Sequence, residues 1–265
     1  MLLDFDRLGW VRWFLVAIGV MACAFLLLPI VFIVLLSFGS SRWLIFPPPS
    51  WTTKWYVEFF SNTQWLQSAL TSAEIAVLVS ILSVFVGLCS ALAITRGTFP
   101  GRNYLRMLLL MPMVLPVVVL AVGIYSLFLR IGLNGTLAGF VLAHLVIALP
   151  FSVIVIANSL QKFDRSIEDA AILCGATPLQ AKLRVTFPAI RFSLFTAAIF
   201  SFLASWDEVV IAIFMASPSL QTFPVKIWTT LRQDLTPVIA AASSLLVLLT
   251  VIMLLISGYF MRRIR

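Results

Sequence analysis

Charged side chains are scarce in this sequence: only 11% of its 265 residues are Asp, Glu, Lys or Arg. Hydrophobic residues make up 62%, and the mean hydropathy is +1.11. A soluble domain of this length has too little interior to bury so much apolar surface, which excludes an ordinary water-soluble enzyme or binding module. The composition therefore predicts a chain that lies in lipid.

Cysteine and histidine are also rare. Cys23, Cys89 and Cys174 are too few and too scattered for a disulfide framework. His144 is the only histidine and cannot form a histidine-based metal site, so we expect a buried, hydrogen-bonded imidazole. The sequence lacks the G-x-x-x-x-G-K-[ST] pattern of a P-loop. We therefore expect no catalytic residue, metal or cofactor in this chain.

Long apolar runs are what the sequence has instead. About 20 helical residues cross the hydrocarbon core of a bilayer, and runs of that length recur six times. They predict one all-α transmembrane domain over residues 1–265, with both termini on the same side. The first run is too long for a removable signal peptide, so we expect a retained helix. The expected spans are 14–37, 68–94, 106–129, 136–159, 192–215 and 238–260.

The basic residues indicate which side faces the cytoplasm. Of the 18 Lys and Arg residues, 13 fall on the side of the termini and of segment 160–191. The positive-inside rule therefore predicts that these parts are cytoplasmic. The net charge of +8 reflects this topology and contact with anionic lipid rather than nucleic-acid binding. The 13 are Arg7, Arg12, Arg96, Arg102, Arg106, Lys162, Arg165, Lys182, Arg184, Arg191, Arg262, Arg263 and Arg265.

Aromatic residues and prolines mark other features. The segment 43–65 is rich in both, which is typical of an aromatic belt at the outer interface or of a docking surface for an external partner. Within it, residues 55–60 have the spacing of a short amphipathic helix. Pro112, Pro116 and Pro150 lie inside apolar runs and predict bent or broken helices there.

The segment Asp169–Pro188 is a polar stretch between apolar runs. Its small residues, among them Ala170 and Ala171, predict a short helix with a smooth face. Gly175 predicts a turn, and a second short helix is expected to end near Pro188.

The spacing in this segment resembles the cytoplasmic coupling loop, or EAA loop, of binding-protein-dependent ABC importer permeases. The likeness extends over most of the chain, because the loop lies between the fourth and fifth of six spans. Asp169 stands where the family usually has Glu, and Phe187 where it usually has Leu. Lys182 replaces an aromatic residue of many members, which alters the docking surface. The matching residues are Asp169, Ala170, Ala171, Gly175, Val185, Phe187 and Pro188.

The resemblance implies a type I ABC importer permease fold in a bacterial inner membrane. It implies that the coupling loop, residues 160–191, docks on a cytoplasmic ATPase present in two copies, which would hold the ATP and Mg. It also implies a second, related permease and a periplasmic or extracellular solute-binding protein. Asp169 could pair with a basic residue of the ATPase, could favour the start of a helix, or could do both. The coupling residues implied are Asp169, Ala170, Ala171, Gly175, Val185 and Pro188.

Two adjacent carboxylates, Asp207 and Glu208, lie in the fifth apolar run. Each charge near the bilayer centre costs about 2.5–3.5 kcal/mol, so such residues face protein or water. On a continuous helix they would point about 100° apart and could border one cavity. The pair could instead be solvated at the outer end of the span or pair with Lys226 or Arg232, or one of the two carboxyls could be protonated and hydrogen-bonded.

The motifs S-W-D-E-V-V-I-A-x-F and P-x-K-I-W most resemble the spermidine and putrescine uptake permeases. The resemblance implies a cationic amine substrate, for which Asp207 and Glu208 would line a pathway. Trp206 beside them could stack on an ammonium group or could simply pack. Betaine, ferric ion and inorganic anions are alternative substrates within the same family.

Two other function classes fit less well. An intramembrane aspartyl protease needs two carboxyls that share one proton, and neighbours on one helix diverge. Half of a secondary transporter would show charge relays and internal repeats, and neither is evident. We therefore expect a transport subunit that is not itself an enzyme.

Overall fold

The computed structural model describes residues 9–262, with side chains up to residue 260. In this part of the chain the regular structure is helical, apart from the isolated bridges Gly39–Trp51 and Ser217–Leu220. The all-α prediction is confirmed. Arg7, Arg263 and Arg265, which contributed to the predicted topology, lie outside the described residues, as does the side chain of Arg262.

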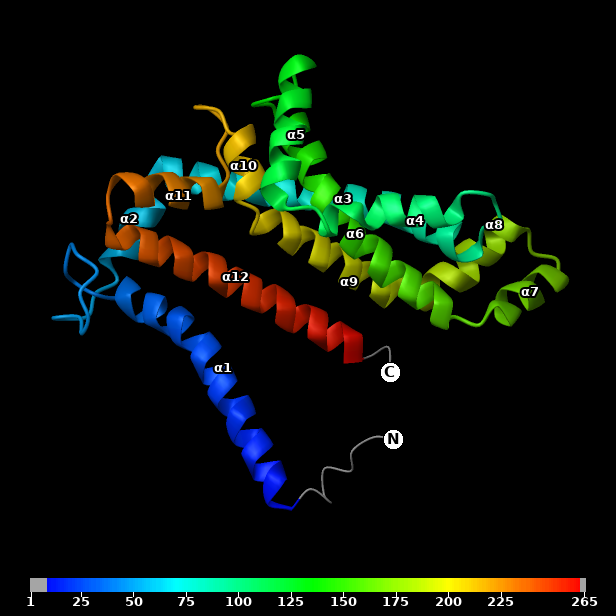
Figure 1. The fold of residues 1–265 in the computed structure, drawn as a ribbon, viewed down its shortest axis with the longest axis horizontal. Helices are drawn as coiled ribbons and strands as arrows, with labels where there is room; N and C mark the ends of the chain where they lie inside the picture. Colours follow the sequence, from blue (N-terminus) through cyan, green and yellow to red (C-terminus); the bar gives the residue numbers. More distant parts are fainter. Residues whose placement is uncertain (1–8, 263–265) are drawn as a thin grey trace. The chain divides into compact units, whose positions relative to one another are not determined.

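The helices follow one another along the chain as labelled in Figure 1. Their bounds are α1 (Trp10–Ser37), α2 (Lys54–Ser61), α3 (Thr63–Arg96), α4 (Arg102–Leu110), η2 (Met111–Met113), α5 (Val117–Arg130), α6 (Leu137–Lys162), α7 (Arg165–Leu173), α8 (Pro178–Ala181), η3 (Lys182–Thr186), α9 (Phe187–Trp206), α10 (Val210–Met215), α11 (Phe223–Gln233) and α12 (Pro237–Arg262).

Five helical stretches of the described chain are long and apolar enough to cross a membrane: α1, α3, α6, Pro178–Trp206 and α12. A sixth candidate is the pair Arg102–Met113 and Val117–Arg130, which is bent by 103°. The predicted six spans are matched when this pair counts as one. Several helices begin earlier than predicted, since α1 starts at Trp10 and α3 at Thr63.

Prolines break the third predicted span as expected. Pro112 lies in the 3-10 turn η2, and Pro116 is the N-cap of α5. Because proline has no N–H to donate, neither residue could form a helical hydrogen bond through its own nitrogen. The chain therefore loses no such bond by changing direction here. Pro150 behaves differently, since α6 continues through it without a break. The prediction of a bent or broken helix therefore holds for Pro112 and Pro116, and no break occurs at Pro150.

The fifth predicted span is not one helix. Helix α9 ends at Trp206 with Asp207 as its C-cap, and the short helix α10 begins at Val210. Glu208 accepts a hydrogen bond from the Ile211 N–H at 2.8 Å, as a capping side chain does at a helix start. The carboxylate thereby stabilises a new helix start in place of a continued helix.

The chain divides into two compact units, each described by itself. The first comprises residues 1–62 and 230–249. In it, Trp55 Nε1 donates to the Gly39 carbonyl at 2.6 Å, and the Tyr56 and Ser37 hydroxyls are 2.7 Å apart. These bonds fix α2, the short helix predicted over residues 55–60, against the end of α1.

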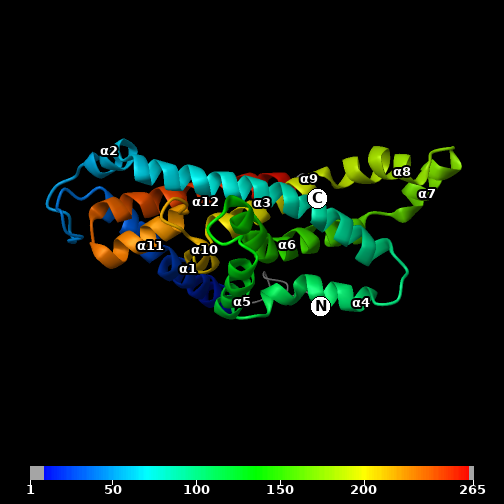
Figure 2. The same ribbon diagram turned by 90° about the horizontal axis from the view of Figure 1, so that it is seen from above.

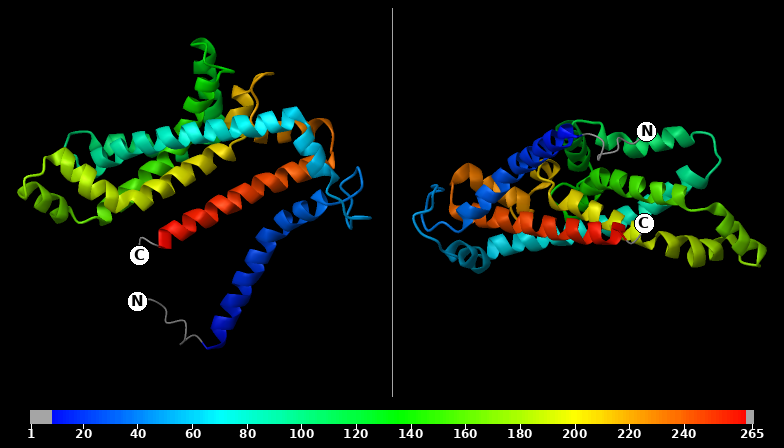
Figure 3. Two further views of the ribbon diagram at one scale, coloured as in Figure 1. Left: turned by 180° about the vertical axis from the view of Figure 1, so that it is seen from behind. Right: turned by 90° about the horizontal axis from the view of Figure 1, so that it is seen from below.

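The second unit, residues 63–229 and 250–265, is built around α3, α6 and α9. Figures 2 and 3 show these three helices side by side. They approach closely: a Cβ on Gly87 of α3 would lie 2.7 Å from the Ser152 Cβ of α6. Small residues allow such close packing in membranes, where polar side chains bond between helices. Here Ser83, Ser152 and Ser201, one from each helix, form a buried ring of hydroxyls 2.7–3.0 Å apart.

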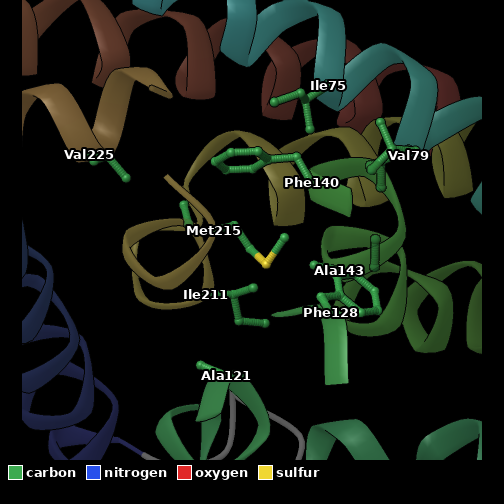
Figure 4. Close-up of a cluster of buried hydrophobic side chains, with 12 residues drawn as sticks. Ile75, Val79, Ala121, Phe128, Phe140, Ala143, Ile211, Met215 and Val225 are labelled. Atoms are coloured by element: carbon green, nitrogen blue, oxygen red, sulfur yellow. The ribbon is translucent and has the colours of Figure 1, made fainter. Parts of the chain in front are cut away.

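A second apolar cluster joins α5 and α10 to α3 and α6. Figure 4 shows Met215 of α10 among Ile211, Phe140 and Ala143. Next to it, His144 Nδ1 lies 2.9 Å from the Ser205 Oγ, and the imidazole is fully buried. The prediction of a buried, hydrogen-bonded histidine is confirmed.

Candidate functional site: the coupling knob and the membrane carboxylates

Helix α7 follows α6 after a linker of two residues, Phe163 and Asp164. Asp164 is the N-cap of α7, and its Oδ1 accepts a hydrogen bond from the Ser166 N–H at 2.9 Å. This bond to the charged carboxylate lowers the pKa of Asp164 below its ordinary value. The start of α7 is therefore fixed directly after this two-residue linker.

Gly175 ends α7 in the way the sequence predicts. Its φ is 93°, a left-handed conformation that glycine adopts without a steric penalty. The Gly175 N–H donates to the Ile172 carbonyl at 2.9 Å, and the Ala176 N–H donates to the Ala171 carbonyl at 3.1 Å. This pair of bonds is the Schellman motif, which satisfies the last carbonyls of a helix. The predicted turn at Gly175 is confirmed.

The second helix of the loop is longer than predicted. Thr177 and Gln180 form a capping box at the start of α8. The chain then passes through the π-helical turn η3 into α9, so that Pro188 lies in the first turn of α9. The expectation that this helix ends near Pro188 is wrong. A proline ring clashes with the carbonyl four residues before it, and the wider π-helical turn just ahead of Pro188 relieves that crowding.

We call residues 165–186, comprising α7, α8 and η3, the coupling knob; the knob and its connections all belong to the second unit. Figure 1 shows α7 and α8 beyond the ends of α6 and α9. Of the residues implied in coupling, Asp169, Ala170 and Gly175 are exposed, while Ala171 and Val185 are half-buried and Pro188 is exposed on α9. The structure therefore places all six on or directly beside one protruding element.

The Asp169 carboxylate forms a weak, exposed ion pair with Arg165. Its Oδ1 lies 3.9 Å from Arg165 Nε, and both side chains are more than half exposed. An exposed ion pair of this kind contributes about 0–1 kcal/mol. The carboxylate is thus accessible to a partner.

Glu168 has a structural role that the sequence pattern did not indicate. Its Oε2 accepts a hydrogen bond from Thr186 Oγ1 at 3.0 Å, and Thr186 is completely buried. This bond closes α7 onto the turn that leads into α9. The only sequence signal was that consecutive carboxylates on a helix point about 100° apart, so Glu168 and Asp169 face different directions.

The knob also carries exposed apolar side chains that sequence reasoning missed. Leu173 is 89% exposed, the most of any large apolar side chain of the described chain. Scattered exposed apolar residues are ordinary, but several on one small protruding element indicate a surface that a partner covers. The others on the knob are Ile167, Ile172, Leu179 and Leu183.

The two membrane carboxylates lie in the break between α9 and α10, not on one continuous helix. Asp207 is exposed, and its Oδ1 accepts a hydrogen bond from Thr250 Oγ1 at 3.3 Å. Glu208 is half-buried and caps α10 through Ile211. The predicted 100° divergence on a helix therefore does not apply. The Asp207 carboxylate is available at the surface, whereas the Glu208 carboxylate is engaged with the backbone.

Trp206 packs with other aromatic rings. It is only 4% exposed, stacks on Phe202 with ring centroids 5.8 Å apart, and lies 6.0 Å from the ring of Phe223. Of the two roles considered from the sequence, the structure supports packing, since the ring is covered.

Comparisons with known proteins agree with the geometry. Over 94% of this chain and 90% of the relative, the sequence is 28% identical to the putrescine transport system permease protein PotI of Escherichia coli K12. It is 29% identical to the spermidine/putrescine transport system permease protein PotC of the same strain, over 82% of each chain. The fold matches a chain of a bacterial ABC transporter involved in alginate import, with a TM-score of 0.74, 16% identity and 98% of both chains covered.

These relatives are transport permeases, which favours a transport subunit over the protease alternative. The likeness to the alginate importer shows the ABC importer permease fold. The sequence profile of binding-protein-dependent transport system inner membrane components matches residues 83–265, more than half of the chain. The chain therefore belongs to this family, the multi-pass inner-membrane permeases of ABC importers.

Proposed function

We propose that this chain forms half of the translocation pathway of an ATP-driven importer for a polyamine or a similar cationic amine. The observation that carries the proposal is the coupling knob, a compact element that protrudes beyond α6 and α9 and exposes both apolar side chains and a carboxylate. The matching relatives support the substrate class, since two of them are permeases for putrescine and spermidine.

The knob is suited to dock in a groove of a cytoplasmic ATPase. Ala170 is exposed, and apart from Gly175 itself and its two chain neighbours, no heavy atom of the described chain lies within 4 Å of a Cβ built on Gly175. These small residues leave room for a partner backbone to approach closely. Leu173 would then be buried against the ATPase, which contributes about 25 cal/mol per Å² of apolar surface removed from water.

The energy for transport would come from the partner. Because this sequence has no P-loop, ATP and Mg would be held by the ATPase, present in two copies. A second, related permease would complete the pathway, and a solute-binding protein would deliver the substrate. Docking on the cytoplasmic side requires that the knob faces the cytoplasm, in line with the basic residues around it.

Asp207 is the better candidate for contact with substrate. Its carboxylate is exposed in the second unit, whereas the Glu208 carboxylate already bonds to the Ile211 N–H. A carboxylate on the pathway lowers the electrostatic barrier for an ammonium group and raises it for an anion. Glu208 would stabilise the break between α9 and α10 that leaves Asp207 exposed. Trp206 would support this break by packing.

Reconstitution tests the proposal. The tagged chain should co-purify with an ATPase and a second permease, and proteoliposomes of this complex should take up putrescine or spermidine when ATP and the binding protein are supplied. Glycine betaine, ferric ion and phosphate serve as competing substrates. Uptake of one of these in place of a polyamine would overturn the substrate assignment, and absence of a co-purifying ATPase would overturn the coupling role.

A further inference from the structure

The guanidinium of Arg96, at the C-terminal end of α3, reaches across to the end of α6. Its Nη2 donates to the Leu160 carbonyl at 3.1 Å and to the Phe163 carbonyl at 3.2 Å. Phe163 is the C-cap of α6 and the first of the two linker residues before α7. A side chain from α3 therefore holds the backbone at the hinge between α6 and the coupling knob.

We propose that Arg96 is the positioning residue that transmits motion of the coupling knob to α3. The proposal rests on the coupling role proposed above. Without this contact, α7 would be joined to the membrane helices through the two-residue linker to α6 and through the continuous stretch into α9. With the Arg96 contact in place, a displacement of the linker either moves α3 as well or breaks the hydrogen bonds that the charged guanidinium donates.

The end of α6 stabilises the charge of Arg96. The last carbonyls of α6 carry the negative end of the helix dipole, which favours a cation there. Hydrogen bonds from a guanidinium to carbonyls are charge-assisted and stronger than those between neutral groups. Arg96 Nε is buried without a hydrogen-bond partner in the described chain, so both bonds to α6 run through Nη2.

The Glu168–Thr186 bond completes the arrangement on the other side. It joins α7 to the turn leading into α9, while Arg96 joins the α6–α7 linker to α3. The knob is thereby connected to all three helices that form the core of the second unit. A displacement of α7 is therefore transmitted to α3, α6 and α9 together.

Arg102 supplies a matched control in the same region. Its Nε donates to the Ile94 carbonyl at 2.7 Å, and its Nη1 donates to the Gly97 carbonyl at 3.4 Å. Both acceptors belong to the end of α3 or the residue that follows it. Arg102 thus caps a helix as Arg96 does, but these two bonds stay within the end of α3 and do not join it to the α6–α7 linker.

The experiment compares Arg96→Gln, Arg96→Lys and Arg102→Gln in the assembled complex with its ATPase, in proteoliposomes with putrescine. We expect Arg96→Gln to lower the amount of putrescine transported per ATP hydrolysed about tenfold, which equals a loss of about 1.4 kcal/mol of coupling. Arg96→Lys keeps the charge on a shorter side chain that lacks the planar guanidinium, so we expect about a threefold loss. Arg102→Gln should leave the ratio within about twofold of the unsubstituted complex, since one ordinary cap is lost.

A purely structural role would lower assembly, ATP hydrolysis and uptake together and leave their ratio unchanged, which would overturn the proposal. An equal loss of coupling in Arg102→Gln would also overturn it. If Arg96→Gln does not assemble, the ratio for Arg96→Lys decides in the same way. Failure of the proposed function is distinguishable, because the unsubstituted complex would then show no ATP-dependent putrescine uptake.

Discussion

Thr186 donates a hydrogen bond to Glu168, and this contact joins the first turn of α7, at the base of the coupling knob, to the turn that leads into α9. The two residues are 18 positions apart, yet Thr186 is completely buried at their junction. The proposed docking on an ATPase requires that the knob resist bending where it meets α9. The hydroxyl of Thr186 and the carboxylate of Glu168 give this junction a fixed geometry.

Replacing Thr186 by Val should weaken that junction. The two side chains have nearly the same shape, so the change removes the donor without opening a cavity. We expect the complex to lose about 1 kcal/mol of stability, the usual contribution of one hydrogen bond, and to transport less per ATP hydrolysed. Thr186→Ser keeps the hydroxyl and serves as control. Because Thr186→Ser also removes a buried methyl group, the two variants are compared by the uptake per ATP hydrolysed, and an equal ratio for Val and Ser would contradict this role of the bond.

Replacing Gly175 by Leu should prevent docking of the ATPase. Both the positive φ and the space reserved for the partner disfavour a side chain there, at a backbone cost of about 1–2 kcal/mol. Gly101→Leu is a matched control, because Gly101 also has a positive φ, 89°, with no described atom within 4 Å of a built Cβ. Pull-down of the ATPase from membranes measures the effect. An equal loss of ATPase recovery in both variants would show that backbone strain alone is responsible, and normal recovery with Gly175→Leu would contradict the docking role.

Replacing Asp207 by Asn should impair uptake of a cationic substrate without affecting assembly. Removal of the exposed charge should raise the KM for putrescine by about tenfold, equivalent to about 1.4 kcal/mol, while ATPase recovery stays normal. Glu208→Gln is the comparison, since a glutamine oxygen can still accept the Ile211 N–H and cap α10. Initial uptake rates over a range of putrescine concentrations separate the two. An unchanged KM in Asp207→Asn would reject Asp207 as part of the pathway.

Replacing Gly87 by Val should force α3 and α6 apart. Even a Cβ would lie 2.7 Å from the Ser152 Cβ, so the larger side chain overpacks the interface and costs about 1–3 kcal/mol. Gly123→Val on α5 is the control, because no described atom lies within 4 Å of a Cβ there. Thermal unfolding in detergent should show a lower midpoint for Gly87→Val only. Identical midpoints would mean that the interface adjusts without cost.

The parts of the fold that depend on short-range patterns were predictable from the sequence. The apolar runs predicted the long helices, and Gly175 predicted the end of α7, because few other residues adopt a left-handed conformation there. Pro188 was misinterpreted since proline both follows helices and occupies their first turn, and the sequence alone does not distinguish the two. The break at Asp207 was missed for a similar reason: it depends on Glu208 bonding to the backbone, which hydropathy does not record.

The candidate site was predictable only in outline. The spacing from Asp169 to Pro188 identified the loop, but the contacts that fix it, Glu168 to Thr186 and Arg96 to the α6–α7 linker, join residues distant in sequence. Such pairings become visible only when the helices are placed in space. The roles of the coupling residues and of Asp207 remain predictions for the experiments above.

The ring formed by Ser83, Ser152 and Ser201 restricts how this permease can change its conformation. With Ser152 donating to Ser201, every hydroxyl in the ring gives one proton and receives one. In hydrocarbon no water is present to replace a broken bond. Sliding one of the three helices past the others would break two of these hydrogen bonds at once. The trio should therefore tilt as one rigid body, with the bending confined to joints outside it.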